Sequence, residues 1–67
     1  MKKLKFLGST SEHGDCPTLY ELETGDIVVQ GDELTDPDDI AQLRHLKPGE
    51  TAVVIPRSLL IRFAPKE

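Results

Sequence analysis

Two short apolar runs on either side of Thr24-Gly25 constrain the fold more than any other feature of the chain. Residues 18–23 and 26–30 are rich in β-branched and large apolar side chains, which favours strands. A Thr-Gly pair between two such runs is typical of a tight turn. The sequence therefore predicts a β-hairpin over residues 18–30.

The predicted hairpin is best paired so that one of its faces is wholly apolar. This register puts Tyr20 opposite Val29 and Leu22 opposite Ile27. A four-residue loop over residues 23–26, built around a type I turn, closes the hairpin without forcing a β-branched residue to positive φ. We expect these side chains to share one buried core: Tyr20, Leu22, Ile27, Val29, and Val53 or Val54 from a later strand.

A three-residue loop with Gly25 in the left-handed conformation is the alternative. It would set Leu22 against Asp26 and Glu21 against Ile27, so that both faces mix polar and apolar side chains. A one-residue slip moves every side chain to the other face of a sheet. The apolar pattern therefore favours the first register.

Three further segments complete the expected elements. Residues 3–7 alternate lysine with large apolar side chains, which predicts a half-buried strand ending at Gly8. Residues 51–55 are the densest β-branched run and predict a central strand that Pro56 ends. Residues 57–63 fit either a helical turn or a last strand, and we expect a turn followed by a short extended piece.

A helix over residues 37–46 is predicted by its start signals. Asp36 is a favourable N-cap, Pro37 suits the first helical position, and Asp38 and Asp39 place negative charge at the positive end of the helix dipole. Three apolar side chains fall on roughly one face of this helix: Ile40, Leu43 and Leu46. The expected fold is α+β and mostly β, a small antiparallel sheet or partly open barrel with this one short helix.

The 67 residues form one small domain, 1–67, near the lower size limit for independent folding. A chain of this size buries only about 60% of its unfolded surface. A homodimer or an obligate partner would bury additional surface, and a homodimer is therefore one of the expected states. No segment is long and apolar enough to cross a membrane, and the single Cys16 fits a reducing compartment. The expected location is cytoplasmic.

Charge is distributed unevenly along the chain. Ten of the 12 acidic residues fall between positions 12 and 39, and no Lys or Arg occurs between positions 6 and 43. Such a segment repels phosphates, so we expect no direct nucleic-acid binding. It is either a solvated surface or a face that docks a basic protein. The candidate partner-binding residues are Glu21, Glu23, Asp32 and Glu33.

No segment spells a catalytic motif, and we expect a non-enzymatic protein without cofactor or metal. The alternative is a small metal-, ligand- or thiol-dependent protein that uses His13, Asp15 and Cys16. A structural zinc site needs four ligands, usually paired Cys or His, which one Cys and two distant His do not provide. A structural thiol before a proline is the better interpretation of Cys16.

The segments GDCPTLYE, VVQG and LTDP, followed by a strand ending AVVIP, give the chain a family resemblance. It resembles small actinobacterial proteins encoded beside helix-turn-helix regulators, and is more distantly similar to the BldB-type and WhiJ-associated small proteins. The resemblance covers roughly residues 8–60. It implies an accessory protein that binds a transcriptional regulator, and it carries over no catalytic residue. Asp32-Glu33 after Gly31 departs from the more basic or aromatic pattern expected there.

Overall fold

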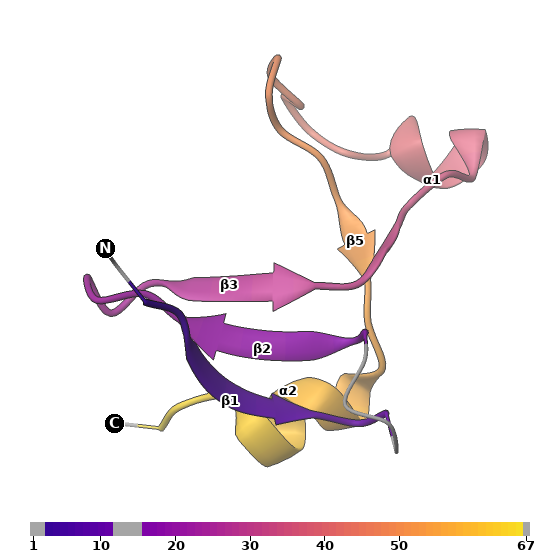
Figure 1. Cartoon of the computed structure of the whole chain (residues 1–67). Coiled ribbons are helices and arrows are strands. Elements are labelled where there is room, and N and C mark those ends of the chain that lie inside the picture. The colour runs from indigo at the N-terminus through magenta and orange to yellow at the C-terminus, as the bar shows by residue number, and fades with distance from the viewer. Residues whose placement is uncertain (1–2, 12–15, 67) are drawn as a thin grey trace.

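A three-stranded antiparallel sheet and a separate two-stranded ribbon make up the fold in the computed structural model, which describes residues 3–11 and 16–66 (Figure 1). The elements follow in the order β1 (Lys5–Ser9), β2 (Thr18–Glu21), β3 (Ile27–Gln30), β4 (Asp32–Glu33), α1 (Pro37–Ile40), β5 (Val53–Val54) and α2 (Arg57–Phe63). The sheet has the order β1-β2-β3, and β4 pairs with β5. The expected α+β class with a small antiparallel sheet is confirmed, and the described residues form no closed barrel.

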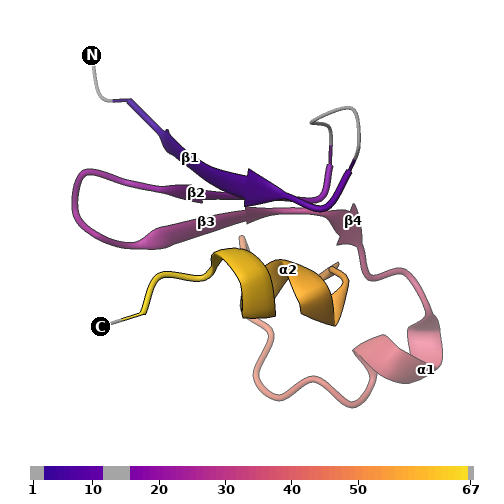
Figure 2. The ribbon, with the colours of Figure 1, turned by 90° about the horizontal axis from the view of Figure 1, so that it is seen from below.

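Helix α2 covers one face of the sheet and forms the core with it (Figure 2). Leu19 on β2 and Leu59 on α2 are both 0% exposed. Phe63 on the same helix lies directly over Gly8 of β1, where a Cβ would overlap its ring. Residues 57–63 are thus helical throughout, so the expected turn followed by a short extended piece is wrong, and α2 adds a second helix to the one expected.

The hairpin register is one residue away from the predicted one, so that prediction is wrong. Leu19 pairs with Val29, and Glu21 pairs with Ile27. The turn is the three-residue alternative: Gly25 has φ 94° and its N–H donates to the carbonyl of Leu22 over 2.9 Å. A type I turn followed by a left-handed glycine is a standard three-residue hairpin loop, and the positive φ at Gly25 needs no β-branched residue to adopt it.

The predicted register failed because the sheet uses both of its faces. Leu19 and Val29 lie on the face that α2 covers, whereas Tyr20 and Val28 lie on the opposite face. There the ring of Tyr20 meets Phe6 of β1 edge to face, with centroids 6.2 Å apart. The core predicted from one apolar face is therefore wrong. Ile27, one of its members, is 40% exposed.

Strand β1 runs through Gly8 rather than ending there. Its register with β2 shifts between Phe6 and Gly8, which marks a bulge at Leu7. The bulge brings Gly8 opposite Leu19, on the face that α2 covers. The missing side chain at Gly8 is therefore a packing requirement of α2.

The chain between β4 and β5 leaves the sheet as a projecting arm, residues 32–54 (Figure 1). Both ends of the arm are held together, because Asp32 pairs with Val54 and the N–H of Leu34 donates to the carbonyl of Ala52 over 2.9 Å. Every residue from 35 to 51 is exposed. The predicted central strand over residues 51–55 is wrong: β5 has two residues, and Val54 is 55% exposed.

Helix α1 is shorter than the predicted helix over residues 37–46. It begins as expected, because the Asp36 side chain accepts hydrogen bonds from the N–H of Asp38 and of Asp39. It ends at Ile40, and the chain turns through residues 41–45 until His45 takes φ 53°. Short helices are stable mainly through packing of an apolar face. The arm is exposed over this whole stretch, so the start signals support one turn only.

Replacing Asp36 with Ala should lower the free energy of unfolding by about 1 kcal/mol, because two backbone N–H groups lose their acceptor. Asp36→Asn should stay within about 0.5 kcal/mol of the wild type, since Asn caps helices as well as Asp. Chemical denaturation measures both. Calorimetry with calcium, magnesium and zinc should show no binding that depends on Asp36. Equal losses in the two variants would mean that the charge of Asp36 matters and its capping does not.

Candidate partner-binding surface

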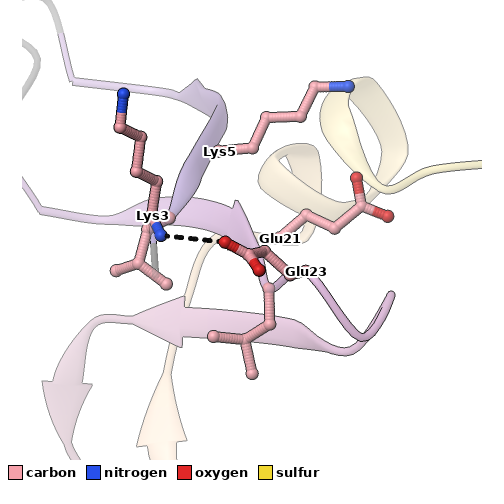
Figure 3. Close-up of a pocket in the computed structure, with 6 residues that line it drawn as sticks. Lys3, Lys5, Glu21 and Glu23 are labelled. Atoms are coloured by element: carbon pink, nitrogen blue, oxygen red, sulfur yellow. Dashed lines mark hydrogen bonds between the residues drawn. The ribbon is translucent and has the colours of Figure 1, made fainter. Parts of the chain in front are cut away.

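Glu21 and Glu23, the first two candidate residues, lie beside lysines at the hairpin end of the sheet (Figure 3). Glu21 on β2 pairs with Lys5 on β1, and both side chains extend on the same side of the sheet. Glu23 accepts a hydrogen bond from the backbone N–H of Lys3 over 3.4 Å. Opposite charges across neighbouring strands attract each other by about 0.2–1 kcal/mol. Lys5 therefore offsets part of the charge of Glu21, whereas the contact of Glu23 with Lys3 is made by a neutral backbone N–H.

The shallow groove between these residues is small, about 380 Å³, and Leu4 and Leu22 complete its lining. Two lysines and two glutamates at its rim give it no excess of either charge. Such a rim does not discriminate between a basic and an acidic partner. The hairpin end is thus a weak candidate for an electrostatic docking face.

Asp32 and Glu33, the other two candidate residues, form β4 at the root of the arm and are both exposed. Glu33 accepts a 3.5 Å hydrogen bond from the hydroxyl of Thr51 on the returning strand of the arm. Three more exposed acids follow closely: Asp36, Asp38 and Asp39. We call these five residues the acidic cluster. No Lys or Arg lies within residues 32–39.

The structure does not bring the four candidate residues together. Glu21 lies opposite Ile27 at the start of β3, whereas Asp32 follows the end of β3. The four residues of β3 separate them by at least about 10 Å at 3.3 Å per residue. Exposed charges are screened over about 8 Å at physiological salt. The two pairs therefore act as separate features, and the arm pair belongs to the acidic cluster.

Sequence reasoning missed the exposed apolar surface of the molecule. Among the described residues, ten large apolar side chains are exposed: Leu4, Phe6, Ile27, Ile40, Leu43, Leu46, Val53, Val54, Leu60 and Ile61. Five of them lie on the arm. The helix-like spacing of Ile40, Leu43 and Leu46 was a usable signal, but it was interpreted as a face turned toward the core.

The alternative site lies mostly outside the described residues, because His13 and Asp15 fall in the segment 12–15. Cys16 is described, and its thiol is free and exposed. Within residues 3–11 and 16–66, no group of three or more His, Cys, Asp or Glu side chains is arranged to hold a metal ion. None of the helices in this part of the chain has the length and apolar character to cross a membrane.

Comparison with protein-family models, with curated proteins and with solved structures finds no match to this chain. The resemblance to proteins encoded beside helix-turn-helix regulators therefore remains a prediction from the sequence.

Proposed function

We propose that this chain is a non-enzymatic accessory protein of the cytoplasm that binds and modulates a helix-turn-helix transcriptional regulator through the acidic cluster of its arm. The observation that carries the proposal is the arm itself. It leaves the sheet at β4, it is exposed from residue 35 to residue 51, and its first eight residues carry five acids. A segment so placed is accessible to a partner without any change in the core.

The chemistry of the acidic cluster selects the kind of partner. Five negative charges within residues 32–39, a stretch that holds no Lys or Arg, favour a positively charged protein surface and disfavour the phosphates of DNA. A DNA-binding regulator carries such a positive surface.

The double variant Asp32→Lys/Glu33→Lys should slow association with the regulator encoded beside this protein by about tenfold at low salt, because steering by charge acts mainly on the association rate. Surface plasmon resonance at two salt concentrations measures the effect. The difference in association rate from the wild type should shrink as the salt concentration rises, since the screening length falls to about 3 Å at 1 M salt. The chain alone should show no affinity for duplex DNA in a mobility-shift assay.

The matched control is Glu21→Lys/Glu23→Lys, which changes the net charge by the same amount at the hairpin end. Because Lys3 and Lys5 line the same groove as this pair, its effect on association should be clearly smaller. Equal slowing in both double variants would attribute the effect to net charge and overturn the role of the arm. An association rate that changes neither with the two double variants nor with salt would overturn the docking role of the acidic cluster. Tight binding of DNA by the chain alone would overturn the proposed function.

A further inference from the structure

Within residues 3–11 and 16–66, no element covers the face of the sheet opposite α2, and this face holds an apolar groove of about 570 Å³. Its lining includes Leu4, Tyr20, Val28, Gln30 and Val53. None of the described residues that line it is charged. A groove of this composition does not select a charged ligand. Contact of its apolar walls with water is unfavourable, so covering the groove would stabilise the protein.

The edge of the sheet beside this groove is also unprotected. β3 is an edge strand, paired only with β2, and its sequence IVVQ has neither charge nor proline. The opposite edge strand, β1, carries Lys5 and a bulge. Charges and bulges are the usual means by which edge strands avoid unwanted pairing. The contrast between the two edges indicates that the β3 edge is covered in the working protein.

The surface area of the chain indicates how large the covering partner is. A monomeric protein of 7.4 kDa exposes about 4,200 Å² by the general scaling of surface with mass. This chain exposes 5753 Å², an excess of about 1,500 Å² over that scaling. Its radius of gyration is 13.4 Å, compared with about 11 Å for a compact domain of this length. If two copies each buried the excess, their interface would total about 3,000 Å², within the range of obligate homodimers.

We propose that the chain forms a two-fold symmetric homodimer in which the arm of each copy covers the apolar groove of the other. Both halves of the required contact are present on one chain: a groove without cover, and an arm whose apolar side chains Ile40, Leu43 and Leu46 are without cover. A two-fold interface uses such a pair of surfaces twice, so both are buried in both copies.

The arrangement of the arm explains why it covers the groove of a second copy and not its own. The arm projects beyond the β3 edge in Figure 1, and α1 lies on the α2 side of the sheet in Figure 2. The groove is on the opposite face. Consider a two-fold axis that runs parallel to β3, just beyond the β3 edge of the sheet. It places the second copy next to the first with the two faces of its sheet exchanged. The arm of the second copy then lies against the uncovered face of the first.

The acidic cluster does not oppose this dimer. The lining of the groove has no acidic side chain, so the arm meets no like charge there. The homodimer uses the apolar side chains Ile40, Leu43 and Leu46, whereas the proposed function uses the acidic cluster of the same arm. The two fail separately, because the homodimer is measured on the protein alone.

Sedimentation equilibrium of the wild-type chain should give a mass twice 7.4 kDa at tens of micromolar. Leu46→Asp, a change on the exposed arm, should shift the protein to the monomer mass because it places a charge in the partner's groove. Ile61→Asp is the matched control: Ile61 is 63% exposed on α2, away from arm and groove, and the dimer should persist. Circular dichroism checks that both variants keep the fold. A wild-type chain that stays monomeric into the millimolar range would overturn the proposal.

Disulfide cross-linking tests which surfaces meet. Two single-cysteine chains, Val28→Cys and Leu46→Cys, each with Cys16→Ser, are mixed and oxidised at low denaturant to allow exchange of copies. A covalent heterodimer should form in the mixture and exceed the cross-linked product of either chain alone. Neither chain can form a disulfide within itself. A stable dimer that forms no preferential disulfide between positions 28 and 46, or that Ile61→Asp dissociates, would overturn the arm-in-groove arrangement.

Discussion

Replacing Leu19 with Ala should lower the free energy of unfolding by about 3 kcal/mol, the largest loss of any single truncation in the sheet. Leu19 is 0% exposed and lies on the face that α2 covers, so the truncation leaves a cavity that few neighbours can fill. A chain of 67 residues has a total stability of only about 3–10 kcal/mol. The variant should therefore lose about a third or more of the stability of the fold.

Ile27→Ala is the matched control for Leu19→Ala, because it removes a β-branched side chain of similar size from the neighbouring strand. Ile27 is 40% exposed, and its truncation should cost about 1 kcal/mol or less. Urea denaturation at one fixed protein concentration compares the two, since self-association adds a concentration-dependent stabilisation. A larger loss for Ile27→Ala than for Leu19→Ala would restore the register with Tyr20 opposite Val29.

Gly8→Ala should cost about 2 kcal/mol, because the added Cβ overlaps the ring of Phe63 and pushes α2 away from β1. The glycine is required here by close approach of the helix. Combining Gly8→Ala with Phe63→Leu should recover at least half of the loss relative to Phe63→Leu alone, since the smaller side chain leaves room for the methyl group. A double-mutant cycle measures this coupling. Strictly additive losses would mean that Gly8 is needed for the bulge itself.

The hairpin and the start of helix α1 could be predicted from the sequence, because each depends on residues that are neighbours along the chain. Thr24-Gly25 marks a turn wherever it occurs between strands, and Asp36 caps the backbone two and three residues later. Such signals need no knowledge of the remaining chain. Their positions in the structure agree with the expectation, although the elements they start are shorter.

The hairpin register and the composition of the core could not be predicted from the sequence, because they depend on what lies on each face of the sheet. The preference for Tyr20 opposite Val29 assumed one buried and one solvated face. α2 covers the Leu19 face, and the Phe6–Tyr20 contact makes the opposite face apolar as well. The position of α2 depends on the absence of a side chain at Gly8, a contact 55 residues apart in the sequence that no local pattern encodes.

The candidate partner-binding surface could likewise be predicted only in part. The acidic composition of residues 32–39 was visible in the sequence, and the structure places these residues on an exposed arm. The position of Glu21 and Glu23 beside Lys3 and Lys5 was not visible, since these lysines lie far away along the chain and come close only through the pairing of β1 with β2.

The contact between Gly8 and Phe63 also sets the order in which this protein can acquire its structure during synthesis. A ribosome releases the sheet strands and the arm before α2, so Leu19 has no cover from Leu59 until residues 57–63 have emerged. Contacts between distant parts of a chain also form slowly. Until α2 docks, the nascent chain displays both faces of its sheet to the chaperones and proteases of the cell.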